Sequence, residues 1–221
     1  MKDVALKARD SSALSGNGAP LVRELAVAKA IQERLGRLYQ LDDGPMVTDF
    51  ASVGEDEERE TLFVREPEPG ALEMHLRVPR LGKKAFSLDD GHSLDRMCQL
   101  IEGVSHFIYV ADRANKDRAT TQLELELQAE VDKYVVLVGA LPSLDERSSR
   151  TLRERLFEDP KYLHDAGSEE GERYRLAHGL AAKFTKRLEV HIVGRTFDAM
   201  RGELRRFFRM GQGDKLRAVH T

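Results

Sequence analysis

The chain has 221 residues, of which 33% are charged and 41% hydrophobic, and a formal net charge of −3 at pH 7. This balance is typical of a soluble globular protein, and the chain is long enough to bury a sizeable core. No apolar run approaches the roughly 18 residues of a membrane-spanning helix. No apolar stretch of the signal-peptide kind follows Met1, and the single cysteine, Cys98, excludes an intrachain disulfide. Together these features predict a cytoplasmic protein.

The N-terminal residues 1–18 are small and polar, which predicts a flexible tail. Pro20 then suits the first position of a helix, where its missing N–H costs nothing. Apolar residues recur at helical spacing from Leu21 through about residue 40, so the first helix is expected there.

Residues 46–79 change to a shorter period, and we interpret them as a small antiparallel β-meander inserted after the first helix. From Leu72 to Val78, apolar residues alternate with polar ones, as in a half-buried strand. The turn residues Pro67–Gly70 precede this strand, so the hairpin Thr61–Val78 is the best supported part of the sheet. Its apolar face is expected to pack on a helix.

Residues 93–141 are predicted to form two long amphipathic helices joined by the polar turn Asn115–Ala119. Ser93 can cap the first helix. Thr121 and Glu124 stand at the spacing of a capping box, which predicts the start of the second. A short turn between long helices makes them antiparallel neighbours, so we expect this hairpin to organise the core.

Three further helices are predicted after Pro142. Ser143 and Glu146 repeat the capping-box spacing and predict a short surface helix over residues 144–158. Ser168 is expected to cap a long helix, and Thr196 a last one that runs to Met210. Residues 211–221 are interpreted as a polar tail.

The predicted fold class is therefore mainly α, or α+β. We expect about six helices in a single domain at residues 19–210, forming a multi-helix bundle built on the antiparallel hairpin, with the small sheet at about 46–79.

The net charge conceals a segregation along the chain. From Lys183 to the end there are ten Lys and Arg against four Asp and Glu, a local balance of +6, so the remainder carries −9. This pattern favours either pairing of the basic segment with the protein's own acidic surface or docking of an acidic partner.

No P-loop, dinucleotide-binding glycine motif, nucleophile-elbow serine or zinc-binding cysteine pair occurs in the sequence. These motifs depend on fixed local geometry, so their absence favours a protein that is not an enzyme and needs no cofactor. The lone Cys98 is interpreted as a packing residue rather than a reactive thiol.

Two groups of residues are still candidates for a site. Carboxylates and imidazole four residues apart on the central helices could hold a divalent metal; these are Glu102, His106, Glu126 and Glu130. Helical spacing, however, places Glu102 and His106 opposite the apolar face, so we expect them to face water. The second group is the basic helix near the C-terminus, which carries Arg201, Arg205, Arg206 and Arg209 beside Phe207 and Phe208.

The interpretation we favour is a non-enzymatic interaction or scaffold protein that self-associates as a homo-oligomer or docks a protein partner. For self-association, the first candidate contact of the arginines is the acidic segment Glu55–Glu60 of a second copy. Two alternatives stay open. One is an enzyme whose metal is held by the helix carboxylates, and the other is a nucleic-acid-associated factor that uses the C-terminal arginines.

Overall fold

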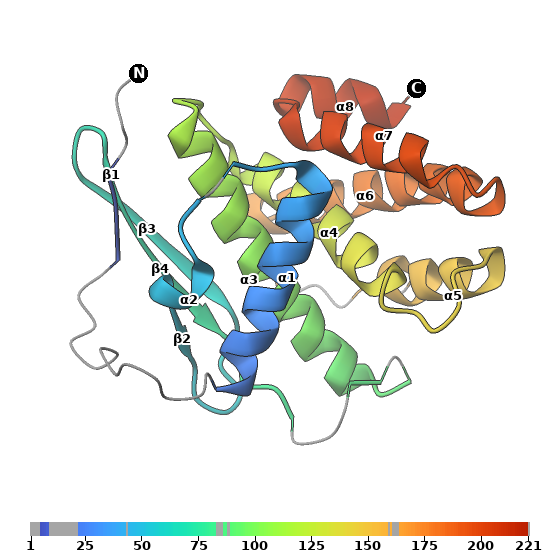
Figure 1. Cartoon of the computed structure of the whole chain (residues 1–221), viewed down its shortest axis with the longest axis horizontal. Helices are drawn as coiled ribbons and strands as arrows, with labels where there is room; N and C mark the ends of the chain where they lie inside the picture. Colours follow the sequence, from blue (N-terminus) through green and yellow to red (C-terminus); the bar gives the residue numbers. More distant parts are fainter. Residues whose placement is uncertain are drawn as a thin grey trace. The chain divides into compact units, whose positions relative to one another are not determined.

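The structure of this chain is a computed structural model, which describes residues 5–8, 22–42, 44–82, 86–87, 89–158, 160 and 164–220. The chain divides into two compact units (Figure 1). The first, which we call the α/β unit, comprises Met1–Arg34 and Leu41–Ala119. The second, which we call the helical unit, comprises Leu35–Gln40 and Thr120–Thr221.

The sheet of the α/β unit is centred on strand β4 (Ala71–Val78), with which three other strands pair. Strand β3 (Thr61–Glu68) pairs with it antiparallel, which confirms the predicted hairpin. Strands β1 (Ala5–Ala8) and β2 (Ala51–Val53) both pair with it in parallel. The sheet is therefore mixed, and the expectation of an antiparallel meander was wrong for β2.

Strand β4 has the two faces that its alternating sequence predicts. Met74, Leu76 and Val78 are buried, whereas His75 and Arg77 are only half-buried. The two parallel strands were beyond prediction because each is only three or four residues long. Parallel pairing is set by which distant segments meet, and no local turn encodes it. In the predicted N-terminal tail, β1 is the only part that the structure describes.

Three helices accompany this sheet. They are α1 (Arg23–Tyr39), the single turn α2 (Val47–Phe50) and α3 (Gly91–Asn115). α3 contacts β4 and β3, and Phe107 of α3 packs against Phe50 of α2 with ring centroids 5.5 Å apart. The helix expected on the apolar face of the sheet is thus present. α3 begins earlier than predicted, because Asp90, and not Ser93, accepts the capping hydrogen bond from the backbone N–H of His92.

The helical unit contains α4 (Gln122–Val138), α5 (Glu146–Phe157), α6 (Glu169–Val193), α7 (Phe197–Arg209) and α8 (Gln212–His220), together with the last turn of α1. α6 contacts each of the other four helices, so it is the central element of this unit (Figure 1). Its buried face is apolar except for Thr185, whose hydroxyl donates to the Ala181 carbonyl one turn earlier.

The helix caps of this unit agree with the sequence in two places and differ in two. Thr121 and Glu124 form the predicted capping box, and Ser168 caps α6 by accepting from the backbone N–H of Gly171. Asp145, and not Ser143, caps α5. An aspartate is as good a cap as a serine, and here it lies two residues further along, so α5 begins two residues later than expected. Thr196 stands at the N-cap of α7 as predicted, but its side chain makes no capping hydrogen bond.

The segment after Gly211 is helix α8, although a polar tail was predicted. Its only buried side chains are Lys215 and Val219, which stand four residues apart. One of the two buried positions of this nine-residue helix holds a lysine, so the sequence shows no stripe of apolar residues at helical spacing. The helix could therefore not be predicted.

The described residues contain eight helices, and the protein is mainly helical with a small mixed sheet, as the predicted fold class required. The antiparallel hairpin and the single domain stay predictions, because α3 belongs to the α/β unit and α4 to the helical unit. Among the described residues, no helix is long and apolar enough to cross a membrane.

Candidate interaction surface

The apolar face of α7 is part of the core of the helical unit. Phe207 stacks on Phe184 of α6 with ring centroids 4.1 Å apart, and Phe208 stacks on Tyr39 at 4.3 Å. Met200 and Leu204 are also buried. This face of α7 therefore packs on the protein's own helical unit, and both phenylalanines are inaccessible to a partner.

The four candidate arginines of α7 do not share one environment. Arg201, Arg206 and Arg209 are exposed, and Arg201 forms an ion pair with Asp198. Arg205 is half-buried, and its Nε donates to the Leu38 carbonyl at 2.7 Å. The accessible charge on α7 is therefore that of the three exposed arginines, whereas Arg205 ties α7 to the end of α1.

Besides the arginines of α7, a group of exposed hydrophobic and basic residues lies on α6. This group was not predicted from the sequence. Leu176, Val190 and Val193 are 48%, 63% and 58% exposed, although each is a large hydrophobic residue. Exposed Lys183 and Lys186 lie between them in the sequence. The alternating three- and four-residue spacing places these side chains on one face of the helix. That spacing was visible in the sequence, but Ala177, Leu180 and Phe184 form a stronger apolar face on the same helix.

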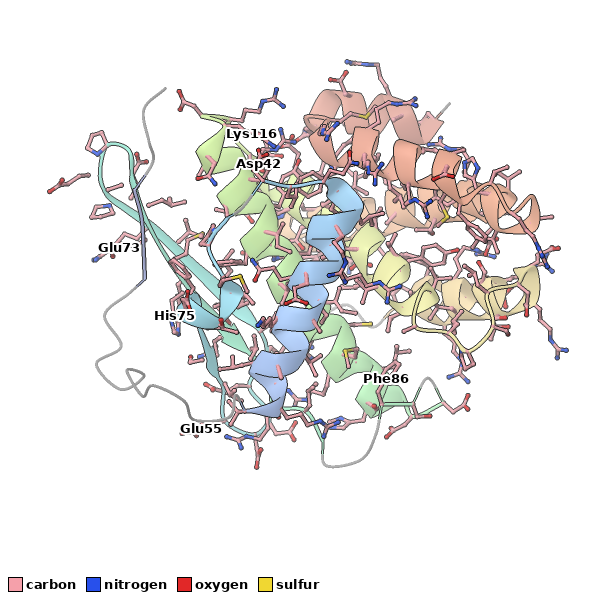
Figure 2. All side chains as sticks on the ribbon, in the orientation of Figure 1. Asp42, Glu55, Glu73, His75, Phe86 and Lys116 are labelled. Carbon is pink, nitrogen blue, oxygen red and sulfur yellow. The ribbon has the colours of Figure 1, made fainter. Side chains whose placement is uncertain are left out.

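The acidic segment that was expected to receive the arginines is already bonded within the α/β unit. Glu57 pairs with Arg96, Glu58 with Arg77 and Asp56 with Arg80, at distances of 3.1–3.3 Å. Figure 2 marks Glu55 in this segment, whose backbone N–H donates to the Glu58 carboxylate at 2.8 Å. The excess negative charge of the segment is thus largely compensated by neighbouring arginines.

A buried polar network lies among α1, α4 and α8 of the helical unit. The Tyr39 hydroxyl donates to Asp132, and the Gln128 amide donates to the same carboxylate at 3.0 Å. The Lys215 ammonium, which is fully buried, donates to the Gln128 carbonyl at 2.5 Å and lies 4.2 Å from the centroid of the Phe207 ring. Burial, followed by the charge of Asp132, raises the pKa of Tyr39 well above its usual range. Asp132 and Lys215 are thus each hydrogen-bonded within the network, so we interpret it as a core element.

The four metal-site candidates lie in more buried surroundings than helical spacing suggested. Glu102 is buried and His106 half-buried, so the expectation that both face water was wrong. Between Gln99 and Ala111, α3 is buried on nearly all sides, which a wheel with one apolar face does not represent. Glu126 of α4 is also buried. Metal binding by these groups, which the sequence offered only as an alternative, stays a hypothesis.

Glu130, the fourth candidate, is engaged by Lys133 and His178 of its own unit. Its carboxylate lies 2.7 Å from Lys133 Nζ and 3.3 Å from His178 Nδ1. Burial by itself raises the pKa of Glu130, but the charge of Lys133 and the hydrogen bonds from His178 and Lys133 outweigh it, so that the pKa falls to about 2. These contacts join α4 to α6. His178 thus acts as a hydrogen-bonding partner of the Glu130 carboxylate.

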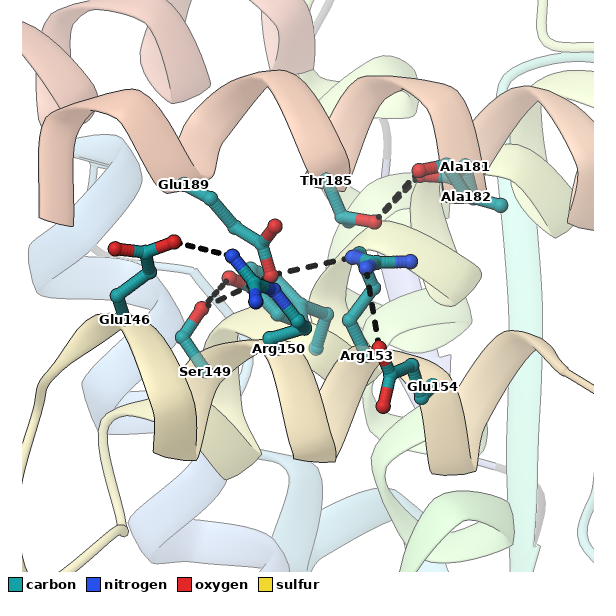
Figure 3. Close-up of polar contacts among 10 residues, drawn as sticks. Glu146, Ser149, Arg150, Arg153, Glu154, Ala181, Ala182, Thr185 and Glu189 are labelled. Atoms are coloured by element: carbon teal, nitrogen blue, oxygen red, sulfur yellow. Dashed lines mark hydrogen bonds and ion pairs between the residues drawn. The ribbon is translucent and has the colours of Figure 1, made fainter. Parts of the chain in front are cut away.

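A further polar cluster joins α5 to α4 and α6. Figure 3 shows Glu189 of α6 close to two side chains of α5, with Oε1 3.1 Å from Arg153 Nε and 3.3 Å from the Ser149 hydroxyl. Ser149 also bonds the Tyr134 hydroxyl at 2.7 Å. Burial raises the pKa of Tyr134 to about 12, so its hydroxyl is protonated at neutral pH. The cluster holds α5 in place.

The junction of α6 and α7 contains a hydroxyl, an imidazole and a carboxylate in sequence. His191 Nδ1 lies 2.9 Å from the Thr196 hydroxyl, and His191 Nε2 lies 3.0 Å from Glu203. A hydroxyl, an imidazole and a carboxylate in this order could suggest a nucleophile and its base. Arg187, however, donates two hydrogen bonds to the Glu203 carboxylate, at 2.6 and 2.9 Å, and neutralises its charge. Arg187 also donates to the Ala218 carbonyl, so the junction links α6, α7 and α8.

Comparison of the chain with protein-family models, with curated proteins and with solved structures returned no match.

Proposed function

We propose that this chain is a non-enzymatic interaction protein whose helical unit binds an acidic surface of a protein partner. The observation that carries the proposal is the accessible charge of the C-terminal segment. Seven cations there are exposed, namely Lys183, Lys186, Arg195, Arg201, Arg206, Arg209 and Arg217. Among the residues of the segment that the structure describes, two carboxylates are exposed, Asp198 and Asp214.

The remaining charges of the segment are used internally. Lys215 is buried, Arg187 is bonded to Glu203, and Arg205 is bonded to a backbone carbonyl. The excess positive charge is therefore concentrated in side chains that solvent and a partner can reach. Surface charge of this kind accelerates the approach of an oppositely charged partner and contributes to its selection.

An external partner is favoured over a second copy as the acceptor. The acidic segment at residues 55–60, which was the first candidate for self-association, already bonds to three arginines of its own unit. A second copy would have to displace those contacts before it could receive the arginines of α7.

The test is binding of fluorescein-labelled poly-L-glutamate, measured by anisotropy at low and high salt. The wild type should bind, and added salt should weaken binding, because the contacts lie at the surface. Reversal of Arg201, Arg206 and Arg209 to glutamate should weaken binding by about tenfold or more, since each 1.4 kcal/mol is tenfold in affinity. The circular dichroism spectrum should not change.

A matched control reverses three surface cations of the α/β unit, Lys29, Lys116 and Arg118, which should leave binding unchanged. Figure 2 marks Lys116 after the last turn of α3. If both triple variants lost poly-L-glutamate binding to the same extent, the net charge of the protein would explain the binding, and the proposal would be overturned. Tighter binding of single-stranded RNA or duplex DNA than of poly-L-glutamate at the same salt would support the nucleic-acid alternative instead.

A further inference from the structure

The exposed face of α6 has a regular composition. Its six positions, which we call the α6 seam, follow at alternating spacings of three and four residues and are Leu176, Gly179, Lys183, Lys186, Val190 and Val193. This spacing is that of the contacting positions in a helix pair. All six residues are exposed, whereas the opposite face, with Leu180, Phe184 and Leu188, is buried in the helical unit.

The seam is apolar at both ends and basic in the middle. Leu176 stands at one end, and Val190 and Val193 at the other. Neither Lys183 nor Lys186 makes a hydrogen bond or ion pair with any residue that the structure describes. An exposed helix face is normally polar, so aliphatic side chains that flank two uncompensated lysines on it are typical of a contact surface.

A second copy of the chain does not fit this seam. Residues 176 and 193 are equidistant from its centre, so antiparallel pairing of two seams would place Lys183 opposite Lys186 of the other copy. Parallel pairing would place each lysine opposite itself. Both arrangements bring like charges together at the middle of the contact, which disfavours self-pairing.

We propose that the α6 seam binds an amphipathic helix of a partner protein that carries two carboxylates flanked on both sides by aliphatic residues. The carboxylates would pair with Lys183 and Lys186, and the aliphatic residues would cover Leu176, Val190 and Val193. This inference rests on the proposed function and names the partner's chemistry.

The geometry of the seam sets the size of the partner segment. The seam spans 17 residue steps, about 26 Å at 1.5 Å per residue, so a partner helix of about five turns covers it. Gly179, near the Leu176 end, is exposed and has no side chain, and a Cβ added there would meet nothing within 4 Å. A large aliphatic side chain of the partner fits opposite this position, as a knob fits a hole.

The test uses two stapled helical peptides, because isolated helices of about 20 residues are only marginally formed in water. The acidic peptide carries Leu, Leu, Glu, Glu, Leu and Leu at seam spacing, and the basic peptide has Lys in place of both Glu. Isothermal titration should show that the wild-type protein binds the acidic peptide at least about tenfold more tightly than the basic one, since like charges in contact disfavour a complex.

The decisive variant is Lys183→Glu with Lys186→Glu, which should exchange the preference so that the basic peptide binds and the acidic one does not. Val190→Ser with Val193→Ser should weaken both complexes without altering which peptide is preferred. All four substituted positions are exposed on α6, so these variants should fold, and circular dichroism checks that they do.

The possible failures distinguish the two proposals. In one outcome, the acidic peptide binds the wild type, the lysine reversal has no effect on binding, and reversal of Arg201, Arg206 and Arg209 abolishes it. That result would overturn the α6 seam as the binding site and leave the proposed function standing. If neither the acidic peptide nor poly-L-glutamate binds, both proposals are overturned. A wild type that sediments as a dimer and becomes monomeric on Val190→Asp would show a second copy on the seam and overturn the inference.

Discussion

The α/β unit and the helical unit use their charged residues in different ways. In the α/β unit, three of the five acids in residues 55–60 are bonded to arginines of the same unit near the surface. In the helical unit, Asp132 and Lys215 are buried with polar partners, while seven cations of the C-terminal segment are exposed. The charge of a segment therefore does not reveal which of its charges a partner can reach. Most charged side chains of residues 55–60 already have a partner in the same unit. The C-terminal segment instead has more exposed cations than exposed carboxylates.

The largest effect is expected in the sheet of the α/β unit, whose buried face on β4 is wholly apolar. Met74 is 1% exposed, so Met74→Asp would bury an unpaired charge and should cost about 3–5 kcal/mol of unfolding free energy. Urea unfolding followed by circular dichroism measures this cost.

The matched control is His75→Asp, one residue along the same strand, on the half-buried face marked in Figure 2. It removes the bond to the Ser52 hydroxyl at 2.9 Å and should cost about 1 kcal/mol. Equal costs for the two variants would contradict the assignment of faces on β4.

The next largest effect concerns the acid stability of the helical unit. The pKa of Glu130 is lowered from 4.5 to about 2 in the folded protein, so the ionised carboxylate stabilises the fold above pH 4.5, and this contribution is lost as pH falls toward 2. The wild type should lose on the order of 3 kcal/mol across that interval through this group.

Glu130→Gln should be less stable than the wild type at pH 6, and the difference should shrink toward pH 2, because the protonated glutamate resembles the amide. Thermal unfolding between pH 6 and pH 2 measures the two profiles. Glu158→Gln, at an exposed position, should follow the wild-type profile. A constant difference between Glu130→Gln and the wild type at every pH would contradict the assigned ionisation of Glu130.

A moderate effect is expected from the buried network of the helical unit. Asp132→Ala removes the acceptor of both the Tyr39 hydroxyl and the Gln128 amide, and each unsatisfied buried group costs about 1–3 kcal/mol. Asp132→Asn keeps an oxygen acceptor and should cost less than Asp132→Ala in urea unfolding. If both variants were as stable as the wild type, the network would not contribute to the core.

The smallest effect on stability is expected at Arg206, which is exposed and makes no ion pair with the described residues. Arg206→Glu should change the unfolding free energy by less than about 0.5 kcal/mol. Its neighbour Arg205 bonds the Leu38 carbonyl, so Arg205→Glu should cost about 1.5–3 kcal/mol, the usual value for a hydrogen bond from a charged group. Thermal unfolding of the two single variants separates the accessible arginine from the structural one.

Local patterns in the sequence were sufficient for several elements. The alternation from Leu72 to Val78 predicted the two faces of β4, and the turn before it predicted the antiparallel pairing with β3. Thr121 with Glu124, and Ser168, predicted the starts of α4 and α6. These features were predictable because hydrogen bonds or side-chain faces within a few residues determine them.

The candidate site was predicted only in part. The sequence identified the basic segment and the apolar face of α7, but it did not separate Arg205 from Arg206, because both are arginines on one helix and only the position of the Leu38 carbonyl distinguishes them. The exposure of the two valines of the α6 seam was not predicted. It depends on which face of α6 is buried in the helical unit, and only the tertiary structure determines that.

The sequence by itself determined the mainly helical class, the β3–β4 hairpin and the charge segregation, since each depends on neighbouring residues or on composition. Only the tertiary structure decided the parallel pairing of β1 and β2, the burial of Lys215 and Glu102, and the engagement of the acidic segment by Arg77, Arg80 and Arg96. The physical reason is the same in each case. A charged or short segment is stabilised by groups that are distant along the chain, and the identity of those groups is fixed when the chain folds.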